Sequence, residues 1–143
     1  MYAQVDWHHG LSFTGTADSG FTVNLGGKKA AGGDEDGFRP LELFLVGLSG
    51  CTGMDVISIL RKKRQDITNF KVSVSAETAA EHPHVFTVIQ IHYTIEGRQI
   101  DPTAVERAIS LSETKYCPAQ AMLSQVADIR SSYEIVEVLE PVT

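Results

Sequence analysis

The first 25 residues alternate between apolar and polar positions with a period of two. The apolar positions fall into three short sets, within residues 3–7, 11–15 and 21–25, and Gly10 and Ser19-Gly20 separate them. This period is typical of strands, because successive side chains point to opposite faces. The segment therefore predicts an antiparallel meander of three strands, followed by a flexible, exposed loop of glycine and acidic residues over 26–37.

Residues 40–63 predict one long helix. Pro40 suits the first helical position because its missing N–H would have no partner there. The basic run 61–64 suits the negative end of the helix dipole. The residues between are apolar almost all round, which predicts a buried central helix. Glycines at 47, 50 and 53 recur along one side, and we expect another backbone to pack close to them.

The second half of the chain predicts two strands, two helices and a last strand. Apolar and polar residues alternate over 70–77 and again over 85–96. Asp101-Pro102 opens a helix, and Pro118 restarts a helical pattern that continues to Val126. A final strand runs through Tyr133, Ile135 and Leu139. The order βββ-α-ββ-α-α-β predicts an α+β fold, with helices against antiparallel sheet, in a single domain over residues 1–143.

Charge and hydropathy narrow the classes of function. The net charge is −6 and the pI is about 5.3, so we expect no nucleic-acid partner. The start of the chain shows neither a basic nor an apolar leader pattern. The most apolar run, 43–48, is too short to cross a bilayer. We therefore expect no membrane association and a cytoplasmic location, where two cysteines stay reduced unless they are catalytic or redox-sensing.

Histidine, serine and glycine patterns point to no further chemistry. The five histidines form neither a zinc-protease nor a deaminase motif. Ser49 lies in no nucleophile elbow, and the glycine-rich loop has no phosphate-binding spacing. We expect no metal and no cofactor.

The two cysteines are the candidate reactive groups. Cys51 lies within the long helix between Gly50 and Gly53, where a cysteine is either a small buried hydrophobe or a thiol with space around it. Cys117 precedes Pro118 and is the expected N-cap of the next helix, which would lower the thiol pKa, with Lys115 adding positive charge. The alternative is an unreactive residue at a helix break. Their spacing excludes a C-x-x-C motif.

Three segments carry a resemblance to a known family. Residues 40–44, 50–56 and 112–118, with the 66-residue separation of Cys51 and Cys117, resemble the OsmC/Ohr family and most closely its YhfA-like branch. The resemblance implies an intertwined homodimer with its sites at the subunit interface. It also implies a peroxidase that reduces organic hydroperoxides. Cys51 would attack the peroxide and become a sulfenic acid, Cys117 would resolve it as a disulfide, and a dithiol would reduce that disulfide.

The chain departs from the peroxidase pattern beside the helix start. Active members of the family carry a glutamate directly after the helix-opening proline, but here that position is Leu41 and Glu42 comes one residue late. They also carry an upstream arginine that holds the thiolate, and the first arginine here is Arg39. The predicted catalytic set is Cys51, Cys117, Arg39 and Glu42. Nine residues place Glu42 about 180° around the helix from Cys51, so its alternative role is to stabilise the helix dipole. The alternative is a non-catalytic member that binds a small apolar molecule or senses oxidants at the dimer interface.

Overall fold

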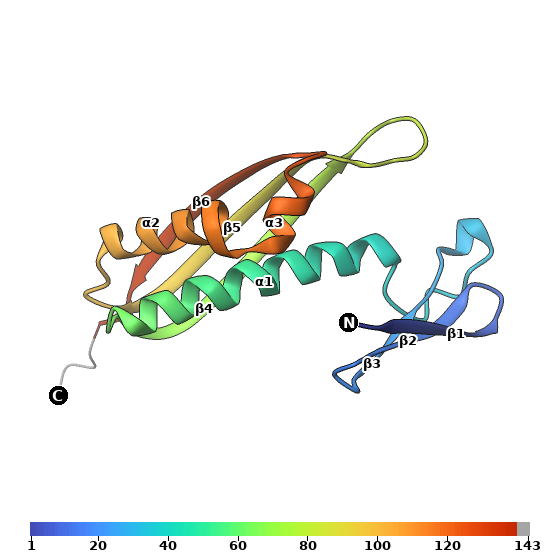
Figure 1. Cartoon of the computed structure of the whole chain (residues 1–143), viewed down its shortest axis with the longest axis horizontal. Helices are drawn as coiled ribbons and strands as arrows, with labels where there is room; N and C mark the ends of the chain where they lie inside the picture. The colour runs from blue at the N-terminus through green and yellow to red at the C-terminus, as the bar shows by residue number, and fades with distance from the viewer. Residues whose placement is uncertain (140–143) are drawn as a thin grey trace. The chain divides into compact units, whose positions relative to one another are not determined.

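The computed structural model of the chain describes residues 1–139. It separates into two compact units, Met1–Leu45 and the part of the chain from Val46 onward. The predicted order of strands and helices is confirmed, with two three-stranded sheets, one in each unit (Figure 1). Whether the chain behaves as the predicted single domain stays a prediction.

The first unit contains the predicted meander. Its strands β1 (Ala3–His9), β2 (Ser12–Ala17) and β3 (Thr22–Leu25) pair antiparallel in the order β1-β2-β3. Gly20 turns the chain between β2 and β3 with a φ of +83°, a conformation that glycine adopts without strain.

The loop after β3 is more ordered than the composition predicts. It contains a short 3₁₀ turn, η1 (Lys29–Ala31), and Phe38 both donates its N–H to Asn24 and accepts one from Gly26. A Cβ added at Gly33 would lie 2.2 Å from the carbonyl oxygen of Gly27. The glycines here therefore permit close packing of the backbone. Composition alone predicts a flexible loop.

The second unit is built on a sheet in the order β4-β5-β6. Its strands are β4 (Asp66–Thr78), β5 (Phe86–Arg98) and β6 (Asp128–Glu137). β4 and β5 pair antiparallel as predicted, but β6 runs parallel to β5, which corrects the prediction of purely antiparallel sheet. The connection from β5 to β6 passes through two helices, and a connection of this length returns the chain to the end where β5 began. Leu139 lies beyond the last strand.

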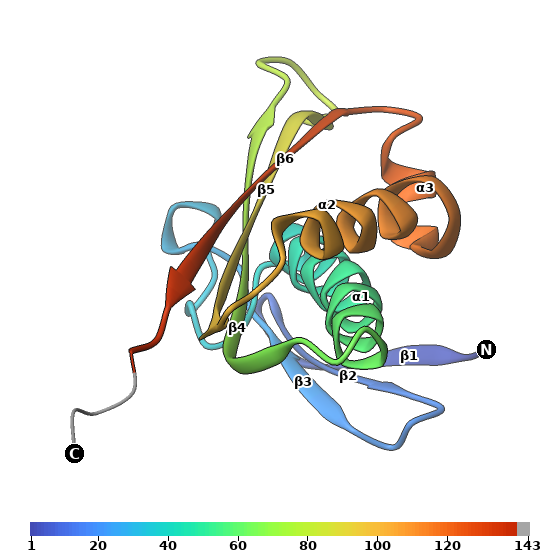
Figure 2. The ribbon, with the colours of Figure 1, turned by 90° about the vertical axis from the view of Figure 1, so that its left-hand side faces the viewer.

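Four helical segments complete the fold: α1 (Pro40–Lys62), α2 (Pro102–Leu111), the π-helical turn η2 (Ser112–Tyr116) and α3 (Pro118–Leu123). In the second unit, α1, α2 and α3 lie on the same face of the sheet (Figure 2). Asp101 caps α2 as predicted, since its carboxylate accepts the N–H of Thr103 at 2.9 Å. α3 ends three residues before the predicted limit, because the chain turns at residues 124–126.

The core of the second unit lies between this sheet and the helices. Its fully buried side chains include Leu48, Val56 and Leu60 of α1, Ile89, Ile91, Tyr93 and Ile95 of β5, and Val105 and Ala108 of α2. The strand faces are those that the alternation over 70–77 and 85–96 predicts. Tyr93 also stacks on Phe70 of β4, with the ring centroids 6.4 Å apart.

The predicted burial of α1 on all sides is wrong for the single chain. Val46 and Met54 are 53% and 74% exposed, because the sheet covers only one side of the helix. The predicted close backbone is not found beside these glycines among the described residues. At Gly53 the neighbour is a side chain, since an added Cβ would lie 3.2 Å from Val72 Cγ2. Gly47 and Gly50 have open space beside them.

α1 is also the one helix within residues 1–139 that is long and apolar enough to cross a membrane. The prediction rested only on the apolar run 43–48, which is too short to cross a bilayer. The small residues after Leu48 prolong this apolar stretch along the helix. Length and composition alone are weak evidence for a membrane span, since core helices satisfy the same criteria. Leu48, Val56 and Leu60 are fully buried in this unit.

Candidate functional site

The two cysteines meet in the second unit. Cys51 lies in α1 and Cys117 between η2 and α3, and their Sγ atoms are 3.0 Å apart, with the Cys117 thiol donating to the Cys51 sulfur. Both are free thiols. The distance is short enough for one sulfur to attack the other after oxidation, with a small adjustment to reach a disulfide.

The π-helical turn places Cys117. Its backbone N–H donates to the carbonyl of Ser112, five residues earlier, at 3.0 Å. Cys117 then leaves the helix with φ −82° and ψ 104°, and Pro118 begins α3. The Cys117 sulfur accepts the backbone N–H of Gln120 at 3.4 Å. The predicted N-cap position of Cys117 is therefore confirmed.

The predicted effect of that position on the thiol is wrong. Burial, assisted by the hydrogen bond to Cys51, raises the pKa of Cys117 to about 11. The N–H of Gln120 acts in the opposite direction and is outweighed. Desolvation of the thiolate exceeds what the backbone N–H groups of Gln120 and Ala119 return. Lys115 is not among the causes of this shift, and its Nζ lies over the ring of Tyr116 at 5.2 Å from the centroid.

The two thiols differ in their exposure to solvent. Cys117 is only 3% exposed, whereas Cys51 is half-buried. An oxidant from solvent therefore reaches Cys51 more readily. Because its pKa is raised to about 11, Cys117 keeps its proton at neutral pH and donates it to the Cys51 sulfur.

A buried hydroxyl cluster lies beside the thiols, and the sequence patterns did not reveal it. Thr52 Oγ1 contacts Tyr93 Oη at 2.6 Å, Ser112 Oγ at 2.8 Å and Gln120 Nε2 at 3.0 Å. Ser112 Oγ also donates to Asp55 Oδ2 at 2.9 Å. The available signal was Ser112, a polar residue at helical spacing from the apolar Val105, Ala108 and Ile109.

Arg39 and Glu42 pair with each other in the first unit. Arg39 Nε lies 3.2 Å from Glu42 Oε1, and both side chains are about half exposed. Their catalytic roles stay predictions.

One group within residues 1–139 has donor atoms suited to a metal ion. His9, Asp34 and Asp36 bring one ligand atom each to within 4.8 Å of one another, and all three are exposed. His9 pairs with Asp34 at 3.4 Å. A hydrogen bond from Ser12 lowers the pKa of Asp36. Exposed acidic groups often gather without a metal, and the histidine pattern gave no signal because both aspartates come from the loop.

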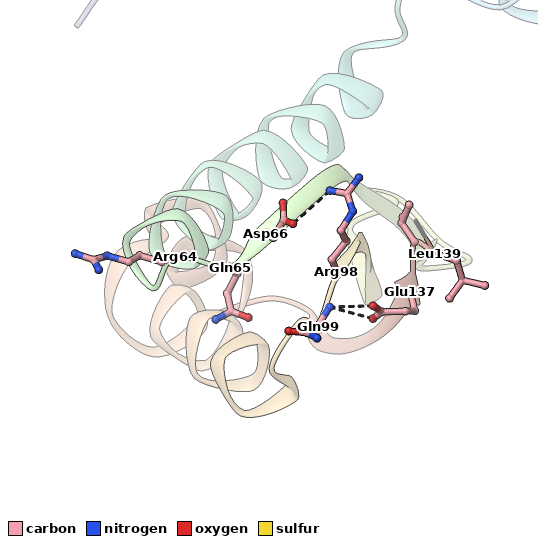
Figure 3. Close-up of a pocket in the computed structure, with 8 residues that line it drawn as sticks. Arg64, Gln65, Asp66, Arg98, Gln99, Glu137 and Leu139 are labelled. Atoms are coloured by element: carbon pink, nitrogen blue, oxygen red, sulfur yellow. Dashed lines mark hydrogen bonds and ion pairs between the residues drawn. The ribbon is translucent and has the colours of Figure 1, made fainter. Parts of the chain in front are cut away.

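A polar hollow of about 480 Å³ lies at the end of the second unit where α1 gives way to β4 (Figure 3). Its two carboxylates are engaged, whereas Arg98 Nε is buried without a hydrogen-bond partner among the described residues. Arg98 pairs with Asp66 at 3.3 Å, and Glu137 accepts the backbone N–H of Gln99 at 3.0 and 3.2 Å. It contains no thiol or hydroxyl among its described lining residues.

The fold and the thiol pair together define a class: α+β proteins in which two free cysteines meet from separate helical segments. Residues 32–132 match the family described as OsmC-like protein. The chain belongs to the OsmC family, as the resemblance predicted.

Relatives extend this likeness over most of the chain. Protein YhfA of Escherichia coli strain K12 is 39% identical over 136 residues, covering 95% of this chain and 98% of that protein. A hypothetical protein from Aquifex aeolicus is similar in structure, with a TM-score of 0.84, 27% identity and coverage of 96% and 97%. An organic hydroperoxide resistance protein OsmC from Legionella pneumophila shares the fold, with a TM-score of 0.71, 16% identity and coverage of 93% and 95%.

Proposed function

We propose that the protein is a thiol peroxidase that reduces organic hydroperoxides through Cys51 and Cys117. The observation that carries the proposal is the 3.0 Å separation of the two sulfurs, one accessible and one buried and protonated. Family membership supports a peroxide-related redox role. The name of the Legionella protein refers to resistance to organic hydroperoxides.

The proposed cycle has three balanced steps. The Cys51 thiolate attacks the terminal peroxide oxygen, the O–O bond breaks, and the alkoxide takes a proton and leaves as an alcohol. Cys51 is then a sulfenic acid. The Cys117 sulfur attacks the Cys51 sulfur, a disulfide forms, and the hydroxyl leaves with the Cys117 proton as water. A dithiol reductant returns both cysteines to thiols and becomes a disulfide itself.

Substitution of Cys51 tests this cycle. Purified wild type and Cys51→Ser are compared for consumption of an alkyl hydroperoxide with excess dithiol. We expect the variant to fall to the uncatalysed background, because serine is a poor nucleophile at neutral pH. Equal rates for the two proteins would contradict the proposal. Ser58→Ala, an exposed change on the same helix, is the matched control and should leave the rate unchanged.

The product of stoichiometric oxidation tests the pairing of the cysteines. After one equivalent of hydroperoxide without reductant, intact mass should fall by about two mass units as the disulfide forms. A gain of about 32, the sulfinic acid, would mean that Cys117 does not resolve Cys51.

A second candidate function has its own support. Leu41 occupies the position of the family glutamate, and Arg39 is engaged with Glu42. The first unit also holds an apolar hollow of about 480 Å³, whose lining includes Val5 and Phe13. These features favour a non-catalytic member that binds a small apolar molecule or senses oxidants. A ligand retained through purification, without peroxide turnover, would establish it, whereas turnover at enzyme-like rates would exclude it.

We further propose that the protein acts as a cytoplasmic homodimer. Family membership supports dimerisation, and so does the exposed row of Val46, Gly50 and Met54 on α1, which has the spacing of a helix-packing surface. Multi-angle light scattering should give twice the chain mass of 15.6 kDa. Two free thiols support a reducing compartment.

A further inference from the structure

The hydroxyl cluster beside the thiols has a single consistent set of hydrogen positions. Ser112 has one hydroxyl proton, and it points to the Asp55 carboxylate, which can only accept. Ser112 must therefore accept the proton of Thr52. Thr52 then has only lone pairs left, so both Tyr93 and Gln120 donate to it. The order runs from Tyr93 through Thr52 and Ser112 to Asp55.

Burial supports this order. Tyr93, Thr52 and Ser112 are fully buried, and Gln120 is 4% exposed. Burial raises the pKa of Tyr93 to about 12, so its hydroxyl keeps the proton that it donates. A buried donor or acceptor left without a partner costs free energy, so all members of the cluster constrain one another.

Thr52 is joined to both residues that hold Cys117. Ser112 accepts the Cys117 backbone N–H through its carbonyl, and the backbone N–H of Gln120 contacts the Cys117 sulfur. Thr52 binds the side chains of both, and it directly follows Cys51 in α1. The cluster therefore links the backbone on either side of the sulfur pair, with Tyr93 anchoring it to the central strand β5.

We propose that Thr52 is a positioning residue that fixes the distance between the Cys51 and Cys117 sulfurs, and that it thereby determines whether oxidised Cys51 closes to a disulfide or is oxidised further. This inference rests on the proposed function for its biological meaning. The step concerned is attack of the Cys117 sulfur on the Cys51 sulfenic sulfur, with loss of water. A second hydroperoxide molecule competes with this attack and gives the sulfinic acid and an alcohol.

The test compares Thr52→Val, which replaces the hydroxyl by a methyl group, with Thr52→Ser, which keeps the hydroxyl. Each folded protein is equilibrated in a dithiothreitol redox buffer, and the disulfide fraction is measured by thiol alkylation and intact mass. We expect Thr52→Val to lower the disulfide equilibrium constant at least tenfold, equivalent to about 30 mV. Thr52→Ser should stay within about twofold of wild type, because the hydrogen bonds persist.

A second readout separates positioning from stability. With excess alkyl hydroperoxide and no reductant, Thr52→Val should show a larger share of the sulfinic product, a mass gain of about 32, than Thr52→Ser. A lower Tm in Thr52→Val with an unchanged disulfide constant would overturn the proposal, since it would show a merely structural role. The dithiothreitol equilibrium uses no hydroperoxide, so its result stands whether or not peroxidase turnover is found.

If Thr52→Val does not fold, Tyr93→Phe tests the same positioning role. It removes the donor to Thr52 and retains the ring that stacks on Phe70. We expect a shift of the disulfide constant in the same direction, of about threefold or more, because Thr52 loses one of its three partners. An unchanged constant in a folded Tyr93→Phe protein would overturn the proposal.

Discussion

The two units of the chain differ in whether their large apolar side chains are buried. Every large apolar side chain that is buried among residues 1–139 belongs to the second unit. In the first unit the whole of β1 is exposed, and Trp7 and Phe21 are 64% and 81% exposed. The second unit thus completes a core by itself, whereas the first presents apolar surface of the kind that usually marks an interaction site.

Chemistry follows the same division. The thiols and the hydroxyl cluster lie in the second unit, where burial can shift the pKa of Cys117 and fix hydrogen bonds. The predicted charged partners, Arg39 and Glu42, lie in the first unit and are half exposed. The cysteine pair therefore forms within the self-contained unit, whereas Arg39 and Glu42 belong to the other unit.

The largest expected effect compares one substitution at two places in α1. Leu48 is fully buried in the second unit, and Leu41 is 45% exposed in the first. We expect Leu48→Ala to lower the free energy of unfolding by about 2–5 kcal/mol through lost burial and cavity formation. Leu41→Ala should change it by no more than about 0.5 kcal/mol. Urea unfolding at low protein concentration measures both, and equal losses would contradict the contrast between the units.

Cys117→Ser is expected to alter turnover next most strongly. The serine cannot form a disulfide, so the Cys51 sulfenic acid waits for an external thiol and is exposed to a second peroxide. We predict a fall in steady-state turnover of roughly tenfold, with progressive inactivation and a mass gain of about 32. Turnover that persists at the wild-type rate, without inactivation, would show that Cys117 is not required for resolution.

High pH should destabilise the protein through Cys117. The folded state raises the pKa of this thiol from 9.0 to about 11 and so holds its proton more tightly than the unfolded chain. This contribution is fully present below pH 9 and is lost as the pH rises toward 11. Unfolding free energies of wild type and Cys117→Ala, measured from pH 8 to about 10.5, should therefore converge as pH rises. Parallel curves would show that burial does not perturb this thiol.

A small effect on stability is expected at the pair Arg39–Glu42. The pair is exposed and three residues apart, so Arg39→Ala should cost about 0.2–1 kcal/mol, and less at high salt. Turnover is the sharper measurement. A fall in turnover for Arg39→Ala at unchanged stability would support the predicted role of Arg39 as a thiolate stabiliser, and Glu42→Gln tests the predicted role of Glu42 in the same way. Unchanged turnover in both variants would restrict the site to the second unit.

Local patterns allowed much of the fold and the centre of the site to be predicted. Alternation over 70–77 and 85–96 located the faces of β4 and β5, and Asp101, Pro102 and Pro118 marked the helix starts. The cysteine motifs with their spacing led to the family, which the match over residues 32–132 confirms. The other site residues, Thr52, Ser112 and Gln120, could not be found this way. Their role depends on contacts between segments 60 and 68 residues apart.

The amino-acid sequence by itself determined the order of strands and helices, the helix caps and the identity of the two thiols. These depend on backbone preferences and on side-chain period over a few residues. Only the tertiary structure decided that β6 is parallel, that α1 is covered on one side, and that the pKa of Cys117 is raised. The physical reason is that strand direction, burial and desolvation depend on what distant segments pack against a residue. At Cys117, the loss of water outweighs the N–H groups of the helix that the residue itself begins.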